Sequence, residues 1–161
     1  MVPMINTLVL FMLFLSRQAA GLSKNENTKM HLLRNEIIQM DTLLFEVAFN
    51  QYDAAIFRKI ISDDVEFYDD RYGLNSSNDL KTKTLIEKYT RAQNVTRKLN
   101  SCTINKLGEF GAVQTGEHTF FVNNIPQGMG KFIHIWERKD KDWKLKRAVS
   151  YEHRSLKNTG S

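Results

Sequence analysis

Three of the four histidines of the chain lie in its C-terminal half, each within a segment of strand-like alternation: His118, His134 and His153. An imidazole titrates near neutral pH, and a carboxylate beside it fixes its tautomer, so each is a candidate general acid or base. The competing interpretation is a strand histidine bonded to a neighbouring backbone group or carboxylate. No two of these histidines stand at the close spacing of zinc motifs, so we expect neither a metal nor a cofactor.

The last strand-like segment, 142–152, adds a second candidate charge. Lys144 and Lys146 mark one of its faces as exposed, and strict alternation then predicts an inner face made of Leu145, Arg147, Val149, Tyr151 and His153. An inward guanidinium keeps its charge and needs a partner. That partner is either an anionic ligand or one of three carboxylates: Asp64, Glu66 or Asp70.

Helices are expected before these strands. Apolar residues recur every three or four positions from Thr28 to about Asn50, which predicts a long amphipathic helix. Asp53 can cap a shorter helix over residues 54–61. A strand over 65–68 and a turn over 69–73 follow, and a third helix is predicted from Ser76 or Ser77 to about Ala92.

The remainder of the chain predicts four strands, at about 97–107, 110–122, 131–139 and 142–152, with turns at Gly108, at 123–128 and at 139–142. Short connections make these strands an antiparallel meander, and helices gathered on one face give an α+β fold. In the third strand Phe132, His134 and Trp136 share one face, while Ile133 and Ile135 share the other. Because both faces are apolar, we expect a homodimer through the back of the sheet.

Composition limits the remaining possibilities. The chain has 161 residues, a net charge of +5 and one cysteine, which fits a single globular domain without internal disulfides or a multi-cysteine zinc site. The basic residues of the stretch 137–147 are interspersed with Glu137, Asp140 and Asp142. This mixture indicates a solvated hairpin, so nucleic acid is not an expected partner.

An unbroken apolar run, Leu8 to Leu15, precedes the small residues Ala19, Ala20 and Gly21. The run is shorter than the approximately 20 residues that cross a bilayer, and it resembles the apolar core of a signal peptide. No Lys or Arg precedes it, so a membrane-tethering anchor is the alternative. The predicted organisation is a signal peptide at 1–21, a short flexible segment at 22–29, a domain at 30–154 and a flexible tail at 155–161.

The order of the predicted elements is similar to that of the nuclear transport factor 2-like (NTF2-like) superfamily, a cone of three N-terminal helices packed on a strongly curved, mainly antiparallel sheet. Local stretches resemble the small, often exported bacterial SnoaL-like proteins of this group. These stretches are Tyr52-Asp53, 61–67, 67–73, 116–121, 130–136, 143–145 and 150–153. The resemblance implies a periplasmic or extracellular bacterial protein that touches the membrane only through its signal segment.

The resemblance also implies a conical pocket for a small hydrophobic or aromatic molecule. Its expected polar residues are Tyr68, Asp70, His118, His134, Arg147, Tyr151 and His153, and its expected walls are Phe67, Phe120, Phe132 and Trp136. Related enzymes combine His, Asp and Tyr, so the catalytic candidates are His118, His153, Asp70 and Tyr68.

Three functions are compatible with this sequence. The leading one is an exported small-molecule-binding domain with no assignable reaction. The alternatives are a cofactor-free lyase or isomerase that uses His and Asp as acid and base, and a structural module that acts through its dimer surface.

Overall fold

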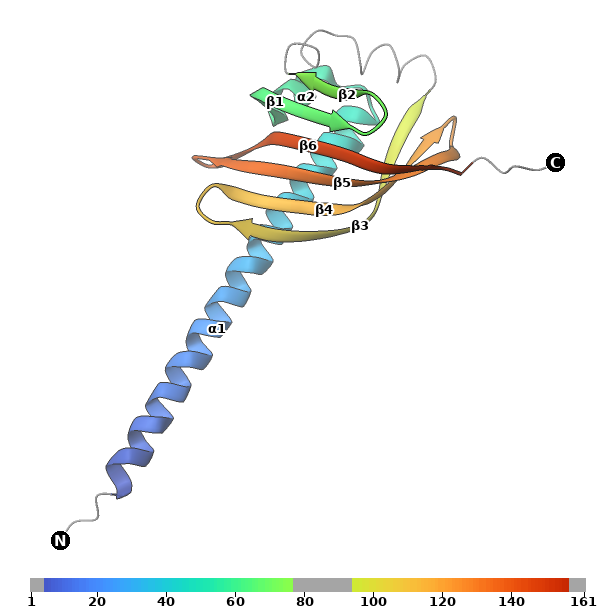
Figure 1. Cartoon of the computed structure of the whole chain (residues 1–161). Coiled ribbons are helices and arrows are strands. Elements are labelled where there is room, and N and C mark those ends of the chain that lie inside the picture. Colours follow the sequence, from blue (N-terminus) through green and yellow to red (C-terminus); the bar gives the residue numbers. More distant parts are fainter. Residues whose placement is uncertain (1–4, 77–93, 157–161) are drawn as a thin grey trace.

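The structure is a computed structural model that describes residues 5–76 and 94–156, with the backbone alone for residues 5–23 and 76. Helix α1 (Ile5–Thr42) continues into a π-helix, η1 (Leu43–Phe49), and α2 (Ala54–Ile60) follows. The strands are β1 (Ile61–Asp69), β2 (Gly73–Ser76), β3 (Val95–Leu107), β4 (Gly111–Val122), β5 (Ile125–Lys139) and β6 (Asp142–Ser155). Figure 1 shows a curved sheet with the end of α1, η1 and α2 on one face.

The first helix is longer than its amphipathic pattern. Residues 22–29, expected to be a short flexible segment, lie inside α1. This stretch contains neither proline nor glycine, and an existing helix needs only one new hydrogen bond for each residue that it adds. The Thr28 hydroxyl donates to the carbonyl of Lys24 one turn earlier, at 2.9 Å. Among the described residues, no helix is both long and apolar enough to cross a membrane.

The capped helix is confirmed. The Asp53 carboxylate accepts from the backbone N–H groups of Ala55 and Ile56, at 3.0 and 2.9 Å. It therefore satisfies two of the donors that a helix N-terminus leaves unpaired. The helix buries Ile60 and ends there, and Ile61 begins β1. The third helix, predicted from Ser76 or Ser77 to about Ala92, lies outside the described residues except for Ser76, which ends β2.

The sheet has the order β2-β1-β6-β5-β4-β3, and β3 to β6 form the predicted antiparallel meander. Strand β1 runs parallel to β6, so the sheet is mixed, and the short β2 returns along β1. The turn predicted over 123–128 is shorter than expected. It consists of Asn123 and Asn124, whose positive φ angles of 50° and 65° suit a two-residue hairpin turn.

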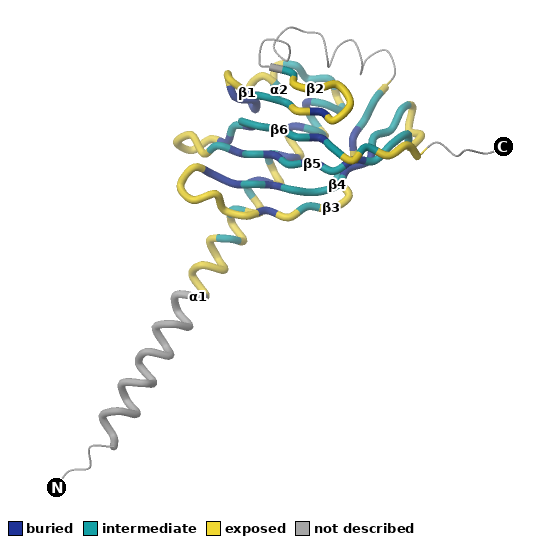
Figure 2. Tube along the Cα trace, viewed as in Figure 1, coloured by how far each residue is buried: buried dark blue, intermediate teal, exposed yellow. Residues whose placement is uncertain are grey.

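The concave face of the sheet carries the core. The side chains of Phe132 and Trp136 are almost completely buried there, and Trp136 shares one buried cluster with Ile37 and Leu44 of the helices. Figure 2 shows this alternation along β5, where buried residues are separated by half-buried ones. The predicted division of β5 into two faces is therefore confirmed, with Ile133 and Ile135 on the convex face.

Strand β6 departs from the alternation that the sequence predicts. Leu145 pairs with Trp136 and Arg147 pairs with Ile135, so Lys146 is an extra residue, a β-bulge. A second irregularity lies opposite Gly130 and includes Glu152, whose φ is 52°.

The two irregularities place different β6 residues on the concave face. Ala148 and Ser150 are buried there, opposite His134 and Phe132. Arg147 and Tyr151 instead pair with Ile135 and Lys131, residues of the opposite parity. The expected inner position of Arg147 and Tyr151 is therefore wrong, because one extra residue in a strand exchanges its faces.

Candidate functional site

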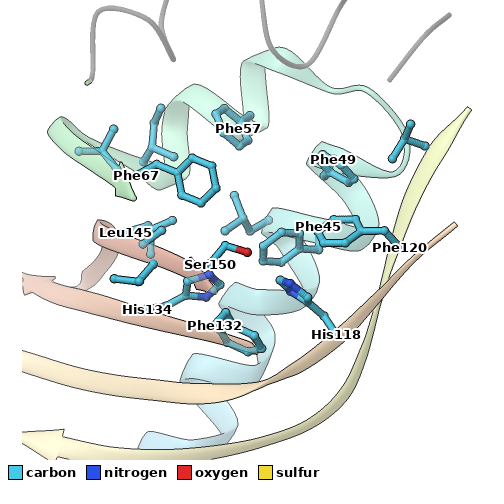
Figure 3. A pocket seen from close by; sticks show the side chains of 16 residues that line it. Phe45, Phe49, Phe57, Phe67, His118, Phe120, Phe132, His134, Leu145 and Ser150 are labelled. Carbon is cyan, nitrogen blue, oxygen red and sulfur yellow. The ribbon is translucent and has the colours of Figure 1, made fainter. Parts of the chain in front are cut away.

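A cavity of about 230 Å³ lies between the helices and the concave face of the sheet. Figure 3 shows its labelled side chains converging from η1, α2 and the strands. Its walls are apolar except for two histidines and one serine. The lining residues are Leu44, Phe45, Phe49, Phe57, Ile61, Val65, Phe67, Val95, His118, Phe120, Phe132, His134, Leu145, Ala148, Val149 and Ser150.

Rings form a continuous wall on one side of this cavity. His134 stacks on Phe45 with ring centroids 5.7 Å apart and an interplanar angle of 13°. Phe132 follows at 4.4 Å from His134, and His118 stacks on Phe132 at 5.2 Å. Aromatic pairs at these separations attract one another through their quadrupoles and by dispersion. The wall therefore offers ring faces and edges to a bound molecule.

Behind this wall lies a buried ion pair. The Arg97 guanidinium donates two hydrogen bonds to the Asp41 carboxylate, at 2.7 and 3.2 Å, and both side chains are at most 4% exposed. Asp41 also accepts from Gln114 at 3.1 Å, and Gln114 accepts from the Trp136 indole at 2.9 Å. We call Asp41, Arg97, Gln114 and Trp136 the closed cluster. Its guanidinium lies 3.9 Å from the Phe45 ring centroid, a cation–π contact.

His118 connects this cluster to the cavity. Arginine can only donate, so the 3.5 Å contact from Arg97 Nε makes His118 Nδ1 an acceptor and leaves the ring proton on Nε2. Burial, together with the nearby charge of Arg97, lowers the pKa of His118 to about 3, so the ring is neutral at physiological pH. Within the described part of the chain its Nε2 has no hydrogen-bond partner. It is a free donor at the edge of an apolar cavity.

His134 is also held neutral. Complete burial, followed by the charge of Arg97, lowers its pKa well below the ordinary value. Among the described residues its Nδ1 has no hydrogen-bond partner. Because its ring packs between Phe45 and Phe132, His134 acts mainly as an aromatic wall.

A hydrogen-bonded chain reaches the cavity from β6, which lies on the other side of β5 from the strand of His118. His153 Nδ1 bonds the Asp70 carboxylate, and His153 Nε2 lies 2.9 Å from the Ser150 hydroxyl oxygen. Burial acts to raise the pKa of Asp70, but the hydrogen bond and charge of His153 outweigh it and hold this pKa below its usual range. We call Asp70, His153 and Ser150 the open cluster, because Ser150 lines the cavity.

A second carboxylate supports the open cluster. Asp69 Oδ2 lies 3.9 Å from His153 Nε2, and Arg71 donates to both oxygens of Asp69, at 3.1 and 3.0 Å. Burial acts to raise the pKa of Asp69, but the bonds and charge of Arg71 lower it overall. Asp69, Asp70 and His153 offer atoms within 4.8 Å of one another, the spacing of metal ligands. Both oxygens of Asp69 already accept from Arg71, so the donor set fits an ion-pair network better.

Gly130 lies between the histidines of the two sides. A Cβ at this position would be 3.3 Å from His153 Nε2 and 3.4 Å from His118 Nε2, and 3.0 Å from His153 Cδ2. Any side chain here would therefore press on both imidazoles. The absence of a Cβ allows the two rings to approach the same point.

The structure divides the predicted site residues into three groups. The cavity is lined by Phe67, His118, Phe120, Phe132 and His134. Asp70 and His153 stand behind Ser150, and Trp136 is buried in the closed cluster. Tyr68, Arg147 and Tyr151 lie outside the cavity lining.

Tyr68 and Arg147 share a partner on the convex side of the sheet. The Tyr68 hydroxyl donates to Glu66 at 2.7 Å, and this bond raises the pKa of the phenol. Arg147 Nε lies 2.8 Å from the same carboxylate. Of the alternatives left open for Arg147, the structure has the carboxylate partner, Glu66.

The sequence reasoning missed several lining residues. Phe45 and Phe49 are spaced by four in the predicted first helix, and this spacing was an available signal for an aromatic face. Ser150 and the ion pair of Asp41 with Arg97 had no comparable signal. The two members of the pair are 56 positions apart in the chain.

No family model matches the sequence, and no curated protein matches it. Several solved structures do match this chain. An NTF2-like superfamily protein from Salmonella enterica serovar Typhimurium LT2 has a TM-score of 0.63 and 14% identity, covering 81% of this chain and 96% of that chain. Hexachlorocyclohexane dehydrochlorinase LinA-type3 from Novosphingobium barchaimii LL02 has a TM-score of 0.61 and 12% identity, covering 84% and 95%.

A third similar structure is the CaMKII hub of S. rosetta, with a TM-score of 0.61, 12% identity and coverage of 73% of this chain and 94% of that chain. The chain therefore has the NTF2-like cone fold. A dehydrochlorinase and a hub share this fold, so function has to be argued from the site.

Proposed function

We propose that this domain binds a small, largely aromatic molecule in the cavity between its helices and its sheet. The observation that carries the proposal is the lining itself, in which His118, His134 and Ser150 are the only polar residues among the sixteen described there. Such a site excludes charged molecules, because their desolvation would not be compensated. It favours an apolar ligand with one or two polar atoms near Ser150 and His118.

The volume limits the ligand. An apolar cavity of about 150 Å³ in another protein takes up benzene. A cavity of about 230 Å³ thus fits a ligand of one substituted ring or two fused rings.

A titration with 2-naphthol, followed by its fluorescence, tests this proposal. Ala148 lines the cavity and is 7% exposed, so Ala148→Met should fill part of the space and weaken binding about tenfold, or about 1.4 kcal/mol. Thr103→Met adds similar bulk at an exposed position of β3 and should leave the affinity unchanged. Equal affinities of the wild type and Ala148→Met would contradict the proposal.

A cofactor-free lyase or isomerase is the second candidate function. The pairing of His153 with Asp70 favours it, because this pair has the composition of a general acid–base unit. Turnover of cyclic enones or hydroxylated aromatics that His153→Asn abolishes would support it. Turnover that survives this change would contradict it.

We further propose that the protein is exported after removal of residues 1–21. The apolar run from Leu8 to Leu15 and the small residues Ala19 and Gly21 support this. The intact mass of the protein recovered from a bacterial periplasm should correspond to a chain that begins at Leu22. Recovery of the uncleaved chain in the membrane fraction would favour the anchor.

The convex face of the sheet supports a homodimer. Val113, Ile133 and Ile135 lie at neighbouring positions of β4 and β5, where Val113 pairs with Ile135, and they make an apolar strip. At its border Arg147 is neutralised by Glu66, so a second copy meets no uncompensated charge there. Native mass spectrometry at micromolar concentration should give twice the chain mass, and Ile135→Lys should give the monomer.

A further inference from the structure

We infer that Ser150 is a nucleophile for acyl transfer from small apolar esters, with His153 as its base and the free N–H of His118 as the donor to the carbonyl oxygen. The inference rests on the proposed function, because the ester has to occupy the cavity.

The bonding order of the open cluster carries the inference. His153 Nδ1 bonds Asp70, and an ionised carboxylate can only accept, so the ring proton lies on Nδ1. Nε2 is then an acceptor, and the Ser150 hydroxyl 2.9 Å away is the group that donates to it. This is the order in which a carboxylate, an imidazole and a hydroxyl activate an oxygen nucleophile.

The atom that faces the ligand is therefore an oxygen. His153 is not among the residues that line the cavity, whereas Ser150 is. The Nε2 atom of His153 is hydrogen-bonded to Ser150, so this nitrogen does not reach a ligand carbon directly. A hydroxyl paired with a base forms covalent acyl intermediates, and this distinguishes the site from one that only moves protons.

Strand β4 supplies the electrophilic group. His118 is 3% exposed and its Nε2–H has no partner among the described residues. Arg97 fixes this tautomer from behind. Figure 3 shows the His118 ring and the Ser150 side chain facing the same space in the cavity. A preoriented donor in an apolar site stabilises the oxyanion that forms when a carbonyl is attacked.

Asp69 adds a second electrostatic effect. Its Oδ2 lies 3.9 Å from His153 Nε2, the nitrogen that gains the proton during attack. Arg71 holds this carboxylate in place through two hydrogen bonds. The negative charges of Asp69 and Asp70 therefore flank the imidazolium and stabilise it.

The reaction balances with water as the only co-reactant. Ser150 Oγ bonds to the acyl carbon, its proton passes to His153 Nε2, and the carbonyl electrons move to the oxygen that faces His118. The bond to the alcohol oxygen then breaks, and His153 returns the proton to that oxygen. In the second half, water gives a proton to His153 and attacks the acyl carbon. Ser150 leaves with that proton, and a carboxylic acid is released.

Diisopropyl fluorophosphate tests the nucleophile directly. The full chain should gain one adduct, which peptide mass spectrometry should place on Ser150. Ser150→Ala should abolish the adduct, whereas Ser101→Ala, at an exposed position of β3, should retain it. An adduct that persists in Ser150→Ala would overturn the inference.

Hydrolysis of p-nitrophenyl butyrate tests the roles proposed for His153, His118 and Asp70. His153→Asn should lower kcat about 100-fold or more. His118→Leu should lower kcat about 100-fold with little change in KM. His118→Gln retains an N–H donor, so its kcat should lie between those of His118→Leu and the wild type. Asp70 is a positioning residue, so Asp70→Asn should lower kcat while 2-naphthol binding stays unchanged.

Binding and chemistry are read separately. If 2-naphthol binds with the expected sensitivity to Ala148→Met but no adduct or ester turnover is found, the acyl-transfer inference is wrong and the binding proposal stands. If 2-naphthol also fails to bind, both fail. Turnover that survives Ser150→Ala would likewise overturn the inference, since the reacting oxygen would then lie elsewhere.

Discussion

The closed and the open clusters both join a carboxylate to nitrogen donors beside the same cavity, yet they are built differently. In the closed cluster, Asp41 accepts from Arg97 and Gln114, and Gln114 accepts from Trp136. None of these side chains lines the cavity. In the open cluster the last member, Ser150, does. A polar chain that ends inside the protein stabilises one arrangement of the core, whereas one that ends at a cavity offers its last atom to a ligand.

This difference separates the residues that the fold needs from those that the site needs. The Asp41 and Arg97 side chains are almost fully buried, so neither charge can be hydrated if its partner is lost. Asp70 keeps a side chain that is 39% exposed. Water can therefore replace the partner of Asp70 but not that of Asp41.

The largest expected effect is on the closed cluster. Asp41→Leu leaves the Arg97 guanidinium buried and unpaired, which should lower the free energy of unfolding by about 3–5 kcal/mol. Urea denaturation measures this loss. The double variant with Arg97→Met should recover a large part of it, because no buried charge then remains. A loss of below about 1 kcal/mol in the single variant would remove the distinction between the clusters.

The next effect is a loss of stability in mild acid. Burial holds the pKa of His118 at about 3 and that of His134 well below its usual range, so both stay neutral in the folded chain. Unfolded histidines titrate near 6.5 and bind protons below that pH. The unfolded state is therefore favoured as the pH falls, and between pH 7 and 5 each histidine should cost about 2 kcal/mol.

Urea denaturation at pH 7 and pH 5 checks this expectation. His118→Phe should remove about half of the pH dependence, whatever its effect at pH 7. A free energy of unfolding that is flat between these pH values would mean that the two rings are not held neutral.

A smaller effect is expected at the end of the closed cluster. Trp136→Phe removes the indole N–H that Gln114 accepts at 2.9 Å. The buried amide oxygen is then left without this donor, so the free energy of unfolding should fall by about 1–3 kcal/mol. Pairing Trp136→Phe with Gln114→Leu tests whether the two act together, because coupled changes are not additive. Additive losses would show that the cluster does not extend to Trp136.

The smallest effect is expected in the open cluster. Asp70→Asn should leave the thermal unfolding midpoint unchanged, because water reaches the position of the carboxylate. Differential scanning calorimetry of the variant and the wild type at pH 7 compares the two midpoints. A decrease as large as that of Asp41→Leu would place Asp70 among the residues that the fold requires.

The sequence predicts the parts of the fold that depend on neighbouring residues. Asp53 caps α2 through bonds to residues two and three positions ahead, and hairpins join the four meander strands. The prediction that Phe132 and His134 share one face is confirmed, because β5 alternates regularly there.

The other features of the fold and site depended on partners distant in the sequence, or on strand positions where the alternation of side chains between the two faces is interrupted. Arg97 could be matched to Asp41 only through a contact across 56 positions. Strict alternation from Lys146 predicts an outer position for Ser150, because the sequence contains no mark of the bulge. His153 kept its predicted side because the irregularity at Glu152 restores the parity that the bulge at Lys146 reverses.

The bulge at Lys146 has a consequence for how this chain can change over evolutionary time. Deleting that one residue would place Arg147 directly after Leu145 in a regular ladder, so Ala148 and Ser150 would keep their partners His134 and Phe132 on the concave face. A homologue with the same serine, histidine and aspartate but without a residue at the position of Lys146 would therefore retain the open cluster. A single-residue gap between Arg147 and Ser150 would instead carry Ser150 to the convex face, so the position of a gap in an alignment decides whether the site is present.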